Sequence, residues 1–185
     1  MAESYDGLRR IGEAYERYIV ERLQREGVPI ARTETKALQF RLGDTTLGIE
    51  IKFDRRHAVT GNFYLEVAEK TSPDKIIFTP SGIYHQPLVP WFSLGDYRDW
   101  YCFKTTALVA VVTAGSFRRV DSPTSQGFVV PLHHLQPLIV RERHWDDREP
   151  DGSWTWPSSP EAEAKMRDLG TAIFGIRYDE HGRAK

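Results

Sequence analysis

The feature that most constrains the fold is a short alternating segment, Gly48 to Asp54, which reads GIEIKFD. Successive side chains of a β-strand point to opposite faces of a sheet. The segment therefore predicts a strand with isoleucine and phenylalanine on one face and Glu50 and Lys52 on the other. The apolar face must pack on a core, and the charged face must meet solvent or a polar site.

Apolar positions predict the other elements. Residues 8–23 carry apolar side chains at three- and four-residue steps, which indicates a helix that ends before Gly27 and Pro29. Residues 37–42 are predicted as a strand that forms a hairpin with 48–54 through the connection GDTTLG. Residues 87–95 are rich in turn formers and are expected to be a loop. Further strands are predicted at 63–67, 100–103, 107–113 and 128–131.

Length and element order indicate one domain. The chain of 185 residues is long enough to bury a core without disulfide staples. We expect a single domain over 1–185, with a core at about 7–113 and additional strands, a loop and a helix in 114–185. The tryptophan-containing stretch 142–159 is interpreted as a surface excursion, and 161–169 as a last helix. A helix followed by strands and then mixed elements predicts an α/β (α+β) fold with a mixed sheet.

Composition excludes several classes of protein. The net charge of −1 is unlike that of a globally basic nucleic-acid coat protein or a polyacidic tail. The single cysteine, Cys102, excludes an intramolecular disulfide and a zinc ribbon, and we interpret it as a core residue. No apolar run approaches the roughly 20 residues of a membrane span. The charged beginning MAESYDGLRR is unlike a signal peptide, so a cytoplasmic location without membrane contact is expected.

The charged face of the 48–54 strand suggests metal chemistry. Glu50 and Lys52 lie two residues apart and project side by side, about 6–7 Å apart along the strand. A carboxylate can hold a hard cation such as Mg²⁺. The cation and the neighbouring ammonium group can then stabilise negative charge on a reacting group. Because one glutamate binds Mg²⁺ weakly, this chemistry requires further carboxylates. A solvated strand face is the plain alternative.

Three further carboxylates are candidates. Asp44 lies in the expected connection before the strand, where it could equally be a simple turn former. Glu66 lies on the next predicted strand, on the opposite face from its apolar residues. Glu16 flanks the apolar stripe of the first helix instead of pointing away from it, although a surface position is an equal alternative.

The order of these residues resembles the PD-(D/E)xK nuclease superfamily. Gly12-Glu-Ala-Tyr-Glu16 is similar to the first-helix signature of its Holliday-junction-resolvase branch. The run GDTTLGIEIKFDRRHAVTGNFYLEVAEK, the later Ser81-Gly82-Ile83, and Gly95-Asp96-Tyr97 with Trp100 resemble uncharacterised nuclease-like proteins of phages and bacteria. The resemblance covers roughly residues 7–110.

The resemblance implies a restriction-endonuclease-like αβββαβ core with a mixed central sheet. It implies a nuclease, endo- or exo-acting, that uses Mg²⁺ or Mn²⁺ to cleave phosphodiester bonds of DNA, or of RNA. If the roles of the family residues apply here, the resemblance implies that Glu50 is a metal-binding carboxylate, Lys52 the charge-stabilising lysine and Glu16 the helix carboxylate. The backbone carbonyl of Ile51 becomes an additional metal ligand. A homodimer is implied only because many members of the superfamily dimerise.

The aspartate position departs from the family pattern. The family aspartate commonly lies further upstream, whereas Asp44 is only six residues before Glu50. If the turn spans Thr45 to Gly48, Asp44 lies diagonally across from Glu50 and can share a metal. If the turn is centred on Asp44, Gln39 faces Glu50 and Glu66 would take the role. We favour Asp44, with Glu66 as a supporting ligand.

Arg55 and Arg56 follow the strand and could contact phosphate, because arginine binds phosphate oxygens in a bidentate manner. An ordinary polar loop is the alternative. Two other functions remain open at this point: a catalytically inactive module on the same fold that binds nucleic acid or a partner, and an α/β protein that binds a small molecule.

Overall fold

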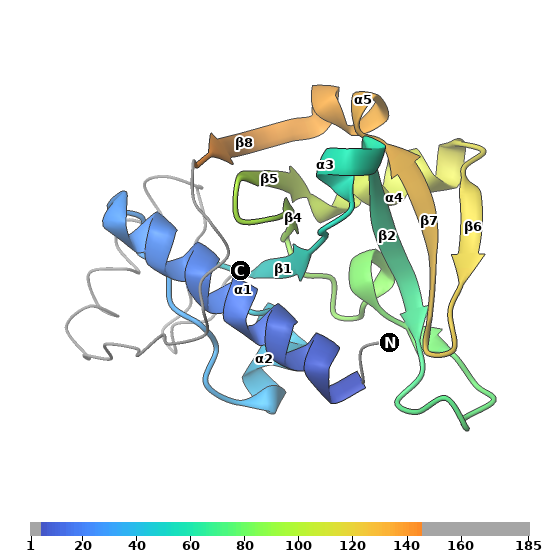
Figure 1. The fold of residues 1–185 in the computed structure, drawn as a ribbon. Helices are drawn as coiled ribbons and strands as arrows, with labels where there is room; N and C mark the ends of the chain where they lie inside the picture. Colours follow the sequence, from blue (N-terminus) through green and yellow to red (C-terminus); the bar gives the residue numbers. More distant parts are fainter. Residues whose placement is uncertain (1–4, 146–185) are drawn as a thin grey trace.

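The first helix is as the sequence predicts. The computed structural model describes residues 5–145 and places α1 over Tyr5–Arg25. Its apolar stripe is buried from Tyr15 to Leu23, with Tyr15 and Ile19 fully enclosed. Gly27 follows with a φ of +79°, a left-handed conformation that suits a residue without a Cβ. The helix lies against β1 and fixes one side of the molecule (Figure 1).

A mixed sheet lies beside α1. Its strand order is β1-β4-β5-β8, so β1 is an edge strand. β1 runs parallel to β4, with Glu50 opposite Phe92 and Lys52 opposite Leu94. The other two pairings are antiparallel. The strands span β1 Ile49–Phe53, β4 Trp91–Gly95, β5 Asp99–Lys104 and β8 Ile139–His144.

A second, antiparallel sheet has the order β3-β2-β7-β6 and stands to the right of β1 in Figure 1. Its strands are β2 Asn62–Glu69, β3 Thr79–Pro80, β6 Arg118–Asp121 and β7 Ser125–Pro131. A register shift between Glu66 and Ala68 interrupts the pairing of β2 with β7. The remaining elements are α2 Lys36–Leu42, α3 His57–Thr60, η1 Gly82–Tyr84, α4 Thr105–Ala114, α5 Leu132–Leu135 and η2 Gln136–Leu138.

The two faces of the mixed sheet belong to two apolar clusters. One joins α1 to the β1 residues Ile49 and Ile51. The other joins Phe92 and Phe103 of the mixed sheet to β2, α4 and α5. Cys102 is buried in the first cluster, as predicted. This arrangement confirms a mixed α/β fold with a mixed sheet, whereas the restriction-endonuclease-like αβββαβ core stays a prediction.

The predicted hairpin is wrong. Residues 36–42 form helix α2, which Thr35 caps by accepting a hydrogen bond from the backbone N–H of Leu38 at 3.2 Å. The Gly43 that follows has a φ of +82° and ends the helix. The short mixed pattern did not reveal this cap. The strand 49–53 therefore pairs with β4 rather than with the segment before it.

Two other assignments are also wrong. Residues 91–95, expected in a loop, form the buried strand β4, which is paired on both sides with β1 and β5. Residues 107–113, expected in a strand, belong to helix α4. A short apolar run has no periodicity that separates a buried strand from a helix. The predicted helix at 161–169 and most of the stretch 142–159 lie outside the described residues.

Among the helices within residues 5–145, none is sufficiently long and apolar for a bilayer crossing.

Gly82 should be intolerant of a side chain. Its φ is +54°, and a Cβ there would lie 2.3 Å from the carbonyl oxygen of Glu66. We expect Gly82→Ala to lower the free energy of unfolding by about 2 kcal/mol or more, measured by urea denaturation. The control is Gly12→Ala, where nothing lies within 4 Å of the added Cβ. That helical change should be neutral or stabilising by up to about 1 kcal/mol. Equal losses in the two variants would contradict the prediction.

Candidate functional site

Glu50 and Lys52 are paired on the edge strand β1. Lys52 Nζ lies 2.7 Å from Glu50 Oε1, and their side chains are 41% and 19% exposed. They project from β1 opposite the isoleucines that pack on α1. The packing of that apolar face thus fixes the direction of the charged face, as the alternation predicts.

Asp44 lies beside this pair, buried to 4% exposure. The turn before β1 spans Thr45 to Gly48, closed by a 3.0 Å hydrogen bond from the Gly48 N–H to the Thr45 carbonyl. The turn spans the residues of the first alternative considered above, but it follows helix α2 and does not join two strands of a hairpin. Asp44 Oδ2 accepts a 2.7 Å hydrogen bond from the Ile51 N–H, and Oδ1 accepts one from the Gln39 side chain at 2.5 Å. Gln39 on α2 therefore positions Asp44 instead of replacing it.

Glu16 and Glu66 reach the same region from other elements. Glu16 of α1 forms a 2.8 Å ion pair with Arg32, and its side chain is only 14% exposed. Glu66 of β2 accepts a 2.6 Å hydrogen bond from the Ser81 hydroxyl. Arg32 and Ser81 were not singled out for these contacts, and no local motif in the sequence indicates either one.

The carboxylates act on one another electrostatically. Burial, and then the charge of Asp44, raise the pKa of Glu16 to about 7. Burial, and then the charge of Glu50, raise the pKa of Asp44 to about 6. Burial also raises the pKa of Glu66. For Lys52, desolvation is outweighed by the charges of Glu50, Asp44 and Glu66, so its pKa lies well above its usual value.

We call these five residues, Glu16, Asp44, Glu50, Lys52 and Glu66, the carboxylate cluster. The cations that lower the pKa values of its acids are Lys52 and Arg32. Two cations facing four carboxylates leave an excess of negative charge, which is the electrostatic condition for holding a divalent ion. Within residues 5–145, however, no three carboxylates of this cluster place ligand atoms within 4.8 Å of one another. The predicted ligand set Asp44, Glu50, Ile51 and Glu66 therefore stays a prediction.

Arg55 and Arg56 follow β1 in an exposed turn. The Arg55 guanidinium lies 5.4 Å from the centre of the Phe53 ring. The Arg56 N–H donates a 2.9 Å hydrogen bond to Asp54 Oδ1. The turn is thus fixed at its backbone, and both arginines lie at the end of the strand that carries Glu50 and Lys52.

Asp54 ties this end of β1 to its surroundings. Its N–H donates a 2.8 Å hydrogen bond to the Gly95 carbonyl of β4. Its Oδ2 accepts a 3.1 Å hydrogen bond from the Tyr64 N–H of β2. One residue therefore links the mixed sheet to the antiparallel sheet.

A second polar group was missed by sequence reasoning. His57, Asp96 and Asp99 place one ligand atom each within 4.8 Å of one another. Asp96 was noted above only within Gly95-Asp96-Tyr97. The available signal was that His57 follows β1 and Asp96 follows β4, because the carboxyl ends of parallel strands meet at one edge of a sheet. With 87–95 assigned to a loop, that signal could not be used.

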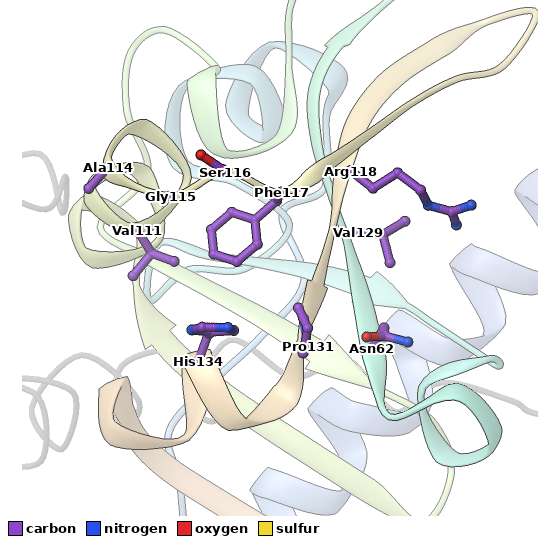
Figure 2. Close-up of a pocket in the computed structure, with 10 residues that line it drawn as sticks. All are labelled: Asn62, Val111, Ala114, Gly115, Ser116, Phe117, Arg118, Val129, Pro131 and His134. Carbon is purple, nitrogen blue, oxygen red and sulfur yellow. The ribbon is translucent and has the colours of Figure 1, made fainter.

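A hollow of about 720 Å³ lies elsewhere, between the end of α4 and strands β6 and β7 (Figure 2). Phe117, Val111 and Pro131 contribute its apolar lining, and His134 and Arg118 lie at it. None of its lining residues belongs to the carboxylate cluster. The hollow therefore adds nothing to the predicted metal chemistry.

No protein-family model, curated protein or solved structure matches the chain.

The raised pKa values predict a pH-dependent stability. Between about pH 4 and 7, the folded metal-free chain retains protons on Glu16 and Asp44 that the unfolded chain has released. The free energy of unfolding should therefore fall as pH rises through this window, by on the order of 1–3 kcal/mol. Urea denaturation with a chelator present, at pH 5 and pH 7.5, measures this change.

The matched variants are Glu16→Gln, Asp44→Asn and Glu13→Gln. The first two should flatten the pH dependence. Glu13→Gln should preserve it, because Glu13 is a partly exposed α1 residue with only a 3.7 Å ion pair to Arg9. The raised pKa values would be contradicted if the free energy of unfolding of the wild type rose from pH 5 to pH 7.5 and Asp44→Asn showed the same pH dependence.

Proposed function

We propose that the protein is a metal-dependent nuclease of the PD-(D/E)xK type that hydrolyses phosphodiester bonds of DNA or RNA. The supporting observation is the carboxylate cluster around Lys52. Residues from α1, from the turn before β1, from β1 and from β2 influence one another's charge there. A solvated strand face would need only Glu50 and Lys52. It would not require the buried carboxylate of Asp44 beside them.

The donor chemistry fits Mg²⁺ or Mn²⁺. Oxygen ligands and an excess of negative charge are what these hard cations require. Asp44 and Glu50 would hold the ion, with the Ile51 carbonyl, and Glu66 would support them. The ion would supply Lewis acidity and a bound water of lowered pKa.

The side chains of the chain would divide the remaining work. Lys52 retains its proton, because the surrounding carboxylates raise its pKa, so it can stabilise negative charge on the phosphate. Its present partner is Glu50 at 2.7 Å, so substrate would draw the ammonium group away from that carboxylate. Glu16, held by Arg32 at 2.8 Å, would orient water through its carboxylate. Gln39 would hold Asp44 in place.

Cleavage assays test this proposal directly. Wild-type protein should cut plasmid or single-stranded DNA or RNA with Mg²⁺ or Mn²⁺ and not with EDTA. Asp44→Asn, Glu50→Gln and Lys52→Met should each reduce the rate at least about 100-fold, since each removes a charge at the reacting phosphate. The control Glu34→Gln changes an exposed carboxylate outside the cluster and should leave the rate unchanged.

Cleavage that survives all three substitutions would refute the site. Salt-dependent binding without cleavage would refute the nuclease and favour the inactive binding module on this fold. Absence of both cleavage and binding would refute the proposal that the protein acts on nucleic acid.

Arg55 and Arg56 are proposed to contact the phosphate backbone. Fluorescence anisotropy measures the affinity for duplex DNA from about 50 to 200 mM salt. The slope of log affinity against log salt concentration then reports the number of phosphate contacts. Arg56→Gln should reduce the magnitude of that slope by about 0.9. Arg119→Gln is the control, because Arg119 lies on β6 in a 3.0 Å pair with Asp121. Equal slopes in wild type and Arg56→Gln would exclude the contact.

A further inference from the structure

A buried histidine lies against two aspartates at the carboxyl ends of β1 and β4. His57 begins α3, and its side chain is 3% exposed. Asp96 follows β4, and Asp99 begins β5. His57 Nε2 lies 3.8 Å from Asp99 Oδ2, and Nδ1 lies 3.9 Å from Asp96 Oδ2. These distances are too long for hydrogen bonds.

The hydrogen bonds of His57 leave one ring nitrogen available. Nδ1 lies 2.7 Å from the carbonyl oxygen of Asp54, which can only accept, so Nδ1 carries the proton and donates. In the neutral ring, Nε2 then presents a lone pair. Nε2 is buried and makes no hydrogen bond to any described residue. A lone pair that faces a carboxylate across 3.8 Å is repelled unless a proton on Nε2 or a metal ion lies between the two groups.

Each aspartate also has one oxygen held and one turned toward the histidine. Asp96 Oδ1 accepts hydrogen bonds from the N–H groups of Arg98 at 2.7 Å and Asp99 at 3.0 Å. Asp99 Oδ1 lies 2.6 Å from His144 Nδ1. The Oδ2 atoms of both aspartates are the ones that approach His57. These contacts hold the side chains from behind, as the supporting residues of metal ligands do.

The spacing suits a single ion. Bonds from zinc to histidine nitrogen and carboxylate oxygen are about 2.0–2.2 Å. Two ligand atoms 3.8 Å apart can therefore bind the same ion. Tyr15 adds a second sign of unbalanced polarity, since its buried hydroxyl has no hydrogen-bond partner in residues 5–145. Burial, and then the charge of Asp96, raise the pKa of that hydroxyl well above its usual value.

We propose that His57, through Nε2, and the carboxylates of Asp96 and Asp99 form a binding site for a divalent metal ion, with Zn²⁺ as its probe, because one ligand atom from each residue lies within 4.8 Å of the others. Imidazole nitrogen favours zinc and related ions over Mg²⁺, which prefers oxygen alone. The ion would clamp the ends of β1 and β4 and the start of β5. This histidine-aspartate site shares no ligand with the carboxylate cluster, and its proposal does not depend on the proposed nuclease activity.

Zinc titration of the full chain against a chromophoric chelator tests the site. We expect one tightly bound Zn²⁺ in wild type, retained in excess Mg²⁺ and in Glu50→Gln. The Asp96→Asn/Asp99→Asn double variant should bind it at least ten-fold more weakly. These near-isosteric changes keep a side-chain oxygen for the hydrogen bonds of Asp96. The control is His133→Gln/His134→Gln, which removes two exposed neighbouring imidazoles and should preserve binding.

Co²⁺ provides an independent measurement. Its visible absorption should report nitrogen and oxygen ligands in wild type and should change in the double aspartate variant. Circular dichroism would verify that this variant is folded. Unchanged zinc affinity in that variant, loss of binding in the His133/His134 control, or no zinc binding by wild type would each overturn the proposal. So would NMR evidence of a doubly protonated His57 that persists in the presence of zinc.

Discussion

The mutual repulsion of the carboxylates around Lys52 determines the protonation of the carboxylate cluster. Glu50 lies 2.7 Å from the ammonium group, and Asp44 and Glu66 act on it at longer range. Without Lys52, these acids would face one another with little compensation, and burial would force more of them to bind protons. The apolar packing of α1 on Ile49 and Ile51 holds the charged face of β1 in this arrangement.

Sequence periodicity predicted the elements of the fold correctly where it was strong. The long stripe of α1 and the alternation of residues 49–53 each extend far enough to determine an element and its buried face. It failed where a tertiary partner decided the structure. Residues 91–95 become a central strand only because β1 and β5 lie on either side, and that pairing is not visible locally.

The candidate site was predictable in part for the same reason. Glu50 and Lys52 share a face by geometry alone, so their proximity follows from the alternation. The position of Asp44 depended on whether residues before the strand formed a hairpin, and α2 replaced that hairpin while Asp44 stayed beside Ile51. The partnership of Glu16 with Arg32 spans two elements, and nothing in the local sequence signals it.

Asp54 gives the architecture a mechanical property. Its backbone is bonded to Gly95 in one sheet, and its carboxylate is bonded to Tyr64 in the other. A displacement of the antiparallel layer would therefore pull on the strand that bears Glu50 and Lys52, only two residues away from Lys52. Movement of one sheet relative to the other would break the hydrogen bonds of Asp54, so a displacement of β2 would be transmitted through Asp54 to the Lys52 ammonium group.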